Sequence, residues 1–238
     1  MALEGPRVIE AALDRGVAIE AVYVGAGSMR AFSTLVQRAV ATGARVAELK
    51  EGVLEKIGTT RTPQPVLATV DRPRHSIDDF EADGTVLVLV DVADPGNVGT
   101  IIRSAEAAGL AGVVLCGTSV DVSNPKVVRS SAGALFGVPT VEADDALAML
   151  EHLGRTGRVR LATRAEHGES LYDADLSGPT AIVLGNEAHG IGADLDSVID
   201  GWITIDLVAP AESLNVAMAA SIVAFEAARQ RRAAGATP

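Results

Sequence analysis

Residues 86–103 read VLVLVDVADPGNVGTIIR, and this stretch decides the fold class. Its first five residues, 86–90, are apolar with no polar alternation, which is typical of a central parallel strand covered on both faces. A Pro-Gly turn follows, and residues 98–108 have the pattern of a helix that Asn97 is placed to cap. A buried strand running directly into a helix predicts an α/β fold.

The same alternation of strand and helix continues on both sides of this stretch. Downstream, strands are predicted at 112–116, 159–163, 181–184 and 202–205, and helices at 125–136 and 214–229. Upstream, helices are predicted at 6–15, 31–42 and 50–57, and strands at 19–24 and 66–70. We therefore expect a small α/β domain over residues 1–75 and a linker over 76–83. A domain over 84–238 follows, with a mostly parallel sheet and helices on both faces.

Composition excludes several classes of protein. Of the 238 residues, 48% are apolar, which is enough for a buried core and excludes a disordered chain. The single cysteine, Cys116, excludes a disulfide framework, and the four histidines show no metal-ligand spacing, so no metal is expected. We find no secretory signal and no membrane span, which predicts a soluble, cytoplasmic protein.

The net charge of −11 by itself argues against a nucleic-acid partner. The charge is unevenly distributed, however. Residues 1–80 contain ten basic and ten acidic residues, so the whole excess of acid lies in residues 81–238. A basic face in the first part therefore remains compatible with RNA.

Three segments stand out because each follows a predicted strand, where open α/β sheets bind ligands. In residues 91–103 the bland interpretation is a turn, a cap and a surface arginine. The sharper one is a helix start and a guanidinium, Arg103, converging on an anionic or hydroxyl-bearing substrate. In residues 184–192 three glycines allow close approach of backbone to a ligand, and Glu187 needs a partner there. In residues 205–218 Ser213 is placed to cap the last helix.

Other chemistry is less well supported. The chain has no nucleophile elbow and no phosphate-binding loop of the GxxxxGK type. A nicotinamide-dependent dehydrogenase would need a glycine-rich turn after the first strand of the sheet, and that turn is missing. Lys126 and Arg129 share one helix face, either as solvated surface or as contacts to phosphate.

Taken together and in this order, the three segments resemble the SpoU (TrmH-type) RNA 2′-O-ribose methyltransferases of the SPOUT superfamily. The resemblance covers roughly residues 84–230, and residues 4–12 and 62–68 are similar to that family's substrate-binding domain. A further stretch, residues 124–134, looks like the family's central helix. The motifs are N-x-G-x-x-x-R at Asn97, Gly99 and Arg103, G-N-E-x-x-G at Gly185, Asn186, Glu187 and Gly190, and S-L-N-V at residues 213–216.

The resemblance implies a C-terminal trefoil knot, one of the rare exceptions to unknotted chains. In the family this knot holds S-adenosylmethionine in a bent form, mostly through backbone groups. Carried over to this chain, the cofactor-binding residues are Leu184, Gly185, Asn186, Gly190, Ile205 and Leu214.

The resemblance also implies methyl transfer to a ribose 2′-hydroxyl in a homodimer. Arg103 would activate or orient the hydroxyl, often across the dimer interface, with general-base action as a hypothesis. Asn97, Glu187, Ser213 and Asn215 would form the surrounding polar network, and Lys126, Arg129, Arg7 and Arg61 would contact RNA. The expected substrate is ribosomal RNA. A transfer-RNA methyltransferase and a catalytically silent RNA-binding relative that keeps the knot are the alternatives.

Overall fold

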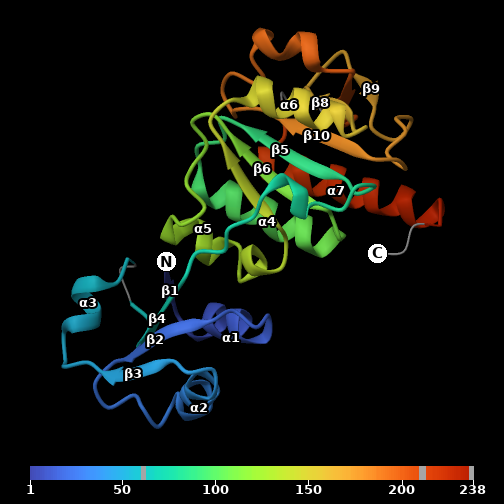
Figure 1. Ribbon diagram of the computed structural model, residues 1–238. Coiled ribbons are helices and arrows are strands. Elements are labelled where there is room, and N and C mark those ends of the chain that lie inside the picture. The colour runs from blue at the N-terminus through green and yellow to red at the C-terminus, as the bar shows by residue number, and fades with distance from the viewer. Residues whose placement is uncertain (60–62, 209–212, 236–238) are drawn as a thin grey trace.

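The computed structural model describes residues 1–59, 63–208 and 213–235, which form two sheets (Figure 1). Every pairing within the larger sheet is parallel, which confirms the predicted α/β fold with a mostly parallel sheet. Its strands lie in the order β7 (Thr140–Ala143), β6 (Gly112–Cys116), β5 (Val86–Val90), β10 (Thr180–Leu184), β8 (Val159–Thr163), β11 (Gly201–Thr204) and β9 (Glu169–Ser170).

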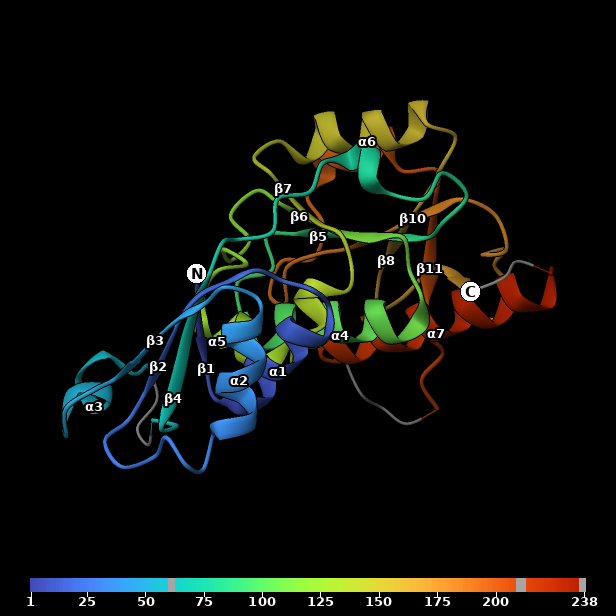
Figure 2. The ribbon, with the colours of Figure 1, turned by 60° about the horizontal axis from the view of Figure 1, so that its bottom comes forward.

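Helices cover both faces of this sheet (Figure 2). On one side lie α4 (Pro95–Ala108), α5 (Pro125–Ser130) and α7 (Val216–Ala233), and on the other lies α6 (Ala146–Arg155) with the short turns η1 (Ile77–Asp79) and η3 (Ala193–Val198). Strand β5 is buried along its whole length, with Leu87 and Leu89 in the core under α4 and α7 and with Val88 in the core on the α6 side. Burial on both faces explains the unbroken apolar run of this strand.

The smaller sheet belongs to the first part of the chain and is mixed. Its order is β1 (Ala2–Glu4), β4 (Val66–Val70), β2 (Ile19–Val24) and β3 (Arg45–Glu48), with only the β2–β3 pair parallel. The helices α1 (Pro6–Asp14), α2 (Ser33–Ala41) and α3 (Val53–Ile57) accompany it. The predicted small α/β unit is therefore present.

The two parts share a core and are joined by polar contacts. Leu3 and Ile9 belong to the same cluster of buried residues as Leu89. Arg15 of the first part donates hydrogen bonds from Nε and Nη2 to Glu106 at the end of α4. The packing is close, because a Cβ on Gly133 would lie 2.3 Å from the Cβ of Ala11.

The segment predicted as a linker, residues 76–83, has packed structure of its own. It contains η1 and buries Phe80, whose ring lies over β6 so closely that a Cβ on Gly112 would be 2.3 Å from it. Phe80 therefore packs this segment onto the larger sheet.

Several elements differ from the sequence predictions. The helix predicted over 125–136 ends at Ser130, because Ala132 and Gly133 have φ values of 51° and 94° in the left-handed region, and only the turn η2 (Ala134–Phe136) follows. Helix α6 and the strands β1, β3, β7 and β9 were not predicted. These strands have at most four residues and offer little periodicity to read.

Among the residues that the structure describes, none of the helices combines the length and the hydrophobicity that a membrane span requires.

Gly99 provides a test of the packing that positions the first motif. A Cβ at this position would lie 1.9 Å from Ser130 Oγ and 2.7 Å from the Val127 carbonyl oxygen, so α4 and α5 could not keep their separation. We expect Gly99→Ala to lower the free energy of unfolding by about 1–3 kcal/mol, the range for overpacked cores.

Urea unfolding followed by circular dichroism measures this change. Gly178→Ala is the matched control, since a Cβ there meets nothing within 4 Å, and it should stay within about 0.5 kcal/mol of wild type. Equal stability of the Gly99 variant and wild type would contradict the close packing of the two helices.

Candidate active site

The first motif enters the site through the start of α4. Asp94 caps this helix, its Oδ1 accepting hydrogen bonds from the backbone N–H groups of Gly96 at 2.7 Å and Asn97 at 2.9 Å. The prediction that Asn97 is the cap is therefore wrong, because the helix begins at Pro95, two residues before Asn97. The carboxamide of Asn97 is left free to contact other segments.

The third motif enters through the start of α7. The side-chain oxygen of Asn215 accepts hydrogen bonds from the N–H groups of Ala217 at 2.9 Å and Met218 at 3.3 Å. The predicted cap, Ser213, is wrong, since the helix starts later, at Val216. Unpaired N–H groups at a helix start bind side-chain oxygens strongly, so the orientation of the Asn215 amide is fixed.

A chain of hydrogen bonds joins the three motifs. Asn215 Nδ2 donates to Asn97 Oδ1 at 3.1 Å, and Asn97 Nδ2 donates to Glu187 Oε1 at 2.8 Å. Because the oxygen of Asn215 is held by α7, its nitrogen must face Asn97, and this in turn directs the nitrogen of Asn97 to Glu187. The helix start thereby orients a carboxylate 28 residues away in the sequence.

The second motif forms a tight loop after β10. Asn186 and Gly190 exchange backbone hydrogen bonds of 2.8 and 3.0 Å. Asn186 Nδ2 also donates to the carbonyl of Asp91 at 2.8 Å, which ties this loop to the end of β5. Only glycine fits at the base of the loop, because a Cβ on Gly185 would lie 2.3 Å from the carbonyl group of Gly190.

Beside this network lies a cavity of about 380 Å³ at the carboxyl end of the sheet. All six predicted cofactor-binding residues line it: Leu184, Gly185, Asn186, Gly190, Ile205 and Leu214. Glu187, Ser213 and Asn215 line it as well. Asn97 does not line the cavity but is hydrogen-bonded to two residues that do, Glu187 and Asn215. The structure thus brings the second and third motifs together around one space.

Part of the lining was not predicted. Thr163, Arg164 and Ala165 come from the end of β8, and Ala219 and Val223 come from α7. The sequence could have indicated the residues at the end of β8. This strand was predicted, and its carboxyl end lies at the same edge of the sheet as the carboxyl end of β10. The α7 residues carry no local signal apart from their helical spacing.

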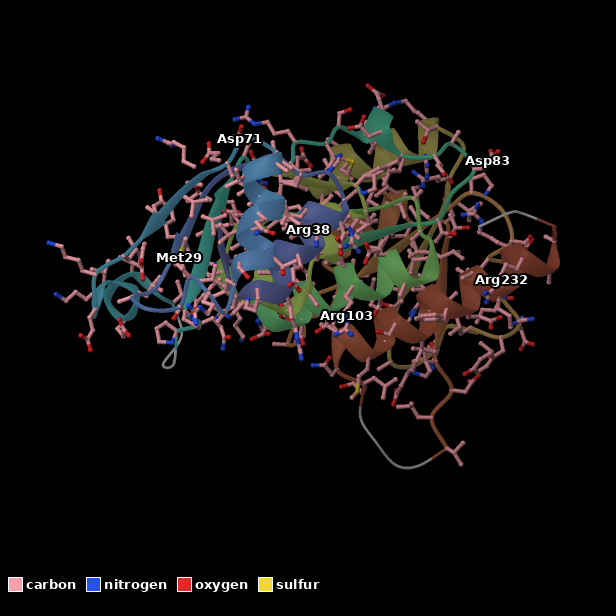
Figure 3. All side chains as sticks on the ribbon, turned by 90° about the horizontal axis from the view of Figure 1, so that it is seen from below. Met29, Arg38, Asp71, Asp83, Arg103 and Arg232 are labelled. Carbon is pink, nitrogen blue, oxygen red and sulfur yellow. The ribbon has the colours of Figure 1, made fainter. Side chains whose placement is uncertain are left out.

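Arg103 does not line this cavity. It is exposed on α4, and within the described part of the chain it has no hydrogen bond or ion pair. Figure 3 shows it on the α4 side of the molecule, with Arg232 toward the far end of α7.

The helices α4 and α7 are held together by a hydrogen bond between the hydroxyls of Ser104 and Ser221 at 2.7 Å. Met218 and Phe225 of α7 are exposed apolar side chains, at 62% and 49%.

The residues predicted to contact RNA have differing surroundings. Lys126 Nζ donates to Asp94 Oδ2 at 3.0 Å and lowers the pKa of that carboxyl group. Arg129 donates to Thr59 Oγ1 at 2.6 Å and lies 3.9 Å from a carboxylate oxygen of Glu4, so it joins the two parts of the chain. Arg7 is exposed. Arg61 lies outside the described residues.

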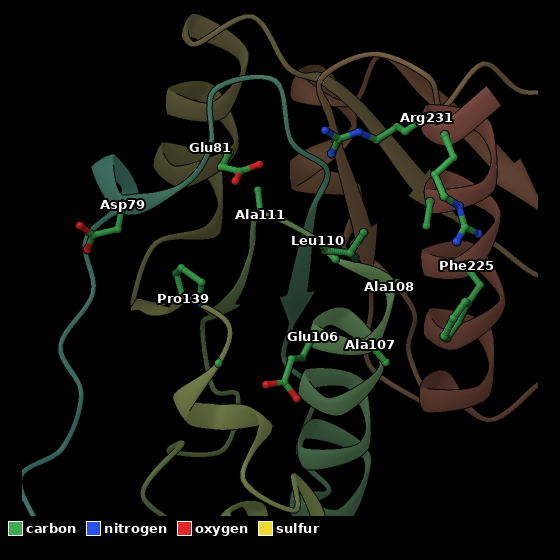
Figure 4. A pocket seen from close by; sticks show the side chains of 14 residues that line it. Asp79, Glu81, Glu106, Ala107, Ala108, Leu110, Ala111, Pro139, Phe225 and Arg231 are labelled. Carbon is green, nitrogen blue, oxygen red and sulfur yellow. The ribbon is translucent and has the colours of Figure 1, made fainter. Parts of the chain in front are cut away.

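A second hollow, of about 520 Å³, lies at the opposite end of the strands (Figure 4). Its floor is apolar, and Glu81, Glu106 and Arg231 stand around it. None of the motif residues lines it, and one oxygen of Glu106 is already bound by Arg15. We therefore assign the chemistry to the smaller cavity. In the described residues no three His, Cys, Asp or Glu side chains gather as metal ligands would.

Comparison with known proteins agrees with this geometry. The SpoU rRNA methylase family matches residues 84–225, and the MRM3-like substrate-binding domain matches residues 1–68. The chain is 32% identical to the 23S rRNA (uridine(2479)-2′-O)-methyltransferase of Streptomyces viridochromogenes, over 95% of this chain and 82% of that protein. It is 31% identical to the 23S rRNA (guanosine(2553)-2′-O)-methyltransferase RlmP of Bacillus subtilis, over 94% and 86%.

Solved structures show the same similarity. The SpoU methyltransferase AviRb from Streptomyces viridochromogenes, in complex with the cofactor AdoMet, superposes with a TM-score of 0.85 and 30% identity. The match covers 98% of this chain and 90% of that one.

Two substitutions at Asn215 separate its structural role from its role in the network. Asn215→Ala removes the cap and should lower the free energy of unfolding by about 1 kcal/mol. Asn215→Asp keeps an oxygen for the N–H groups of α7 and should stay within about 0.5 kcal/mol of wild type.

Chemical unfolding measures both variants. Neither side chain can donate the hydrogen bond to Asn97, so both variants should break the chain of hydrogen bonds to Glu187. Only the alanine variant should also lose stability. If the aspartate variant were as unstable as the alanine variant, the cap would not be what Asn215 contributes to stability.

Proposed function

The chain belongs to the SpoU rRNA methylase family, and from this premise we propose that it methylates a ribose 2′-hydroxyl of ribosomal RNA with S-adenosylmethionine as donor. The observation that carries the proposal is the hydrogen-bonded chain Asn215–Asn97–Glu187 beside the 380 Å³ cavity. Three sequence motifs that are far apart in the chain meet there. Because this network is intact, we favour an enzyme over a silent RNA-binding relative.

The cavity fits the donor in size and in chemistry. Its volume is in the range of small-molecule sites, which are mostly apolar with a few placed polar groups. Ile205 and Leu214 supply apolar walls, and the glycines 185 and 190 leave backbone exposed where an adenine could be gripped through main-chain groups. When bound, S-adenosylmethionine supplies an already activated methyl group.

The protein must then position the ribose and manage one proton. A guanidinium is effectively always protonated, so we assign Arg103 to orienting the hydroxyl and stabilising the negative charge that develops on its oxygen. The polar network that fixes Arg103 and the ribose is assigned to four residues: Asn97, Glu187, Ser213 and Asn215. Arg103 itself must reach the site from its exposed position on α4.

We propose that a homodimer provides this reach. Arg103 does not line the cavity of its own chain, and α7, which a Ser104–Ser221 hydrogen bond holds against the helix of Arg103, exposes Met218 and Phe225. Burial of these apolar side chains against a second copy would stabilise a dimer. In such a dimer Arg103 would serve the partner's site.

We assign the remaining parts of the chain as follows. Residues 1–75 bind RNA, residues 76–83 connect, and residues 84–238 form the methyltransferase domain. A trefoil knot in that domain is supported by family membership and by the way the segments after β10 and β11 meet at one cavity. Ribosomal RNA is favoured over transfer RNA because the named relatives act on 23S rRNA. A ribosomal substrate also favours the cytoplasm as the location.

Mixing two inactive variants tests the role of Arg103 in a dimer. Arg103→Ala should abolish transfer and leave affinity for the donor nearly unchanged. Gly185→Val should abolish donor binding, because its side chain would collide with Gly190. If Arg103 acts in the partner's site, heterodimers contain one working site, and a 1:1 mixture should recover about a quarter of wild-type activity.

The measurement is incorporation of labelled methyl groups into rRNA after the two variants are unfolded, mixed and refolded together. Each variant refolded alone is the control. Absence of recovery, with heterodimers demonstrated, would place Arg103 in the site of its own chain.

Salt dependence tests the RNA-binding assignment of the first part of the chain. Arg7→Ala should weaken RNA binding and reduce the slope of log affinity against log salt by about 0.7–0.9, the value for one lost phosphate contact. Arg155→Ala is the control. This arginine pairs with Glu151 on α6, which covers the face of the larger sheet opposite to α4, α5 and α7. Equal slopes for wild type and the Arg7 variant would remove this residue from the interface.

A further inference from the structure

Two charged side chains line the described part of the donor cavity, Glu187 and Arg164. The guanidinium carbon of Arg164 lies 4.2 Å from the centre of the Trp202 ring, a cation–π contact. Trp202 packs with the core on the α6 side of the sheet, whereas the apolar wall from α7 belongs to the other side. Arg164 is thereby engaged by Trp202, and no ion pair of Glu187, with Arg164 or with another cation, occurs in the described residues.

The carboxylate of Glu187 is held in place but its charge is not cancelled. Among the described residues, the side chain that donates a hydrogen bond to it is the neutral amide of Asn97, which is fixed by Asn215. A neutral donor orients a carboxylate and leaves its charge available to a third group. Apart from Arg164, the rest of the described lining is apolar side chains, backbone, and neutral polar groups. The cavity thus presents one oriented carboxylate that forms no ion pair within the described residues, together with an arginine that stacks on Trp202.

We infer that Glu187 selects ligands by charge, favouring the sulfonium of S-adenosylmethionine over the neutral thioether of S-adenosylhomocysteine. The inference rests on the proposed function and gives Glu187 a part in specificity beyond its part in the polar network. The donor carries a positive charge that the spent cofactor has lost, and the two otherwise share the same adenosine and amino-acid groups. The same carboxylate therefore strengthens donor binding and adds nothing to the binding of the product.

A different role for Glu187 predicts a different result. If its carboxylate only accepted a hydrogen bond from a ribose hydroxyl of the ligand, donor and product would both lose affinity when it is changed. Charge selection predicts that only positively charged ligands lose affinity. The ratio of two dissociation constants therefore separates the two roles, without any need for catalytic turnover.

The experiment is isothermal titration calorimetry of the full chain with three ligands. These are S-adenosylmethionine, S-adenosylhomocysteine and sinefungin, which carries an ammonium group in place of the sulfonium. Glu187→Gln keeps the size of the side chain and an oxygen for Asn97. We expect it to weaken S-adenosylmethionine and sinefungin about fivefold relative to S-adenosylhomocysteine, the scale of a partly exposed charge pair.

Glu166→Gln is the matched control. This carboxylate lies on the same loop as Arg164, its side chain is 79% exposed, and it does not line the cavity. It removes the same charge from the chain and should leave the ratio unchanged. In the wild type the ratio should also shrink as salt rises from about 0.05 to 0.5 M, because salt screens exposed charges, and this measurement needs no variant.

The possible outcomes separate a failure of charge selection from a failure of the proposed function. An unchanged ratio in Glu187→Gln, equal weakening of all three ligands, or a salt-independent ratio in wild type overturns charge selection and leaves the proposed function standing. If wild type binds none of the three ligands, the proposed function fails and this inference fails with it.

Discussion

The two hydrogen bonds made by the amide of Asn97 are the interaction on which the arrangement of the site depends. The amide oxygen of Asn97 accepts a hydrogen bond from Asn215, and the amide nitrogen donates one to Glu187. The Asn97 amide thereby joins the three motifs. Its direction is imposed by α7, whose free N–H groups hold the oxygen of Asn215. A backbone feature of one helix thus sets the orientation of a carboxylate on another segment. The free N–H groups at the start of α7 therefore orient groups beside the cavity through the side-chain amides of Asn215 and Asn97.

The parallel sheet explains why these segments meet. Strands β5 and β10 are neighbours and run in the same direction, so the loops that follow them emerge side by side. Asn186 strengthens this proximity by binding the carbonyl of Asp91, which has an unusual positive φ of 55°. Backbone strain at the end of a strand is found where the surrounding structure determines a functional geometry. The segment that follows β5 is thereby tied to the segment that follows β10.

The first part of the chain is packed onto the second rather than loosely attached. Arg15 binds Glu106 at the end of α4, and Arg129 binds Thr59 near Glu4. Since α4 also carries Asn97 and Arg103, the contact of Arg15 with Glu106 ties the first part of the chain to the helix that carries the first motif. This gives a physical route by which RNA held on residues 1–75 would be placed at a fixed distance from the site.

The sequence by itself determined the fold class, the cavity lining from the second and third motifs, and the family. These follow from local signals, namely buried apolar runs, glycines that only a tight loop requires, and motif spacing. The tertiary structure decided which polar groups pair. Asn97 and Ser213 were both predicted to be helix caps, yet Asp94 and Asn215 are, because α4 begins at Pro95 rather than at 98 and α7 begins at Val216 rather than at 214. Arg129 likewise became a contact between the two parts. A cap or an ion pair depends on where distant atoms come to lie, and periodicity along the chain carries no such information.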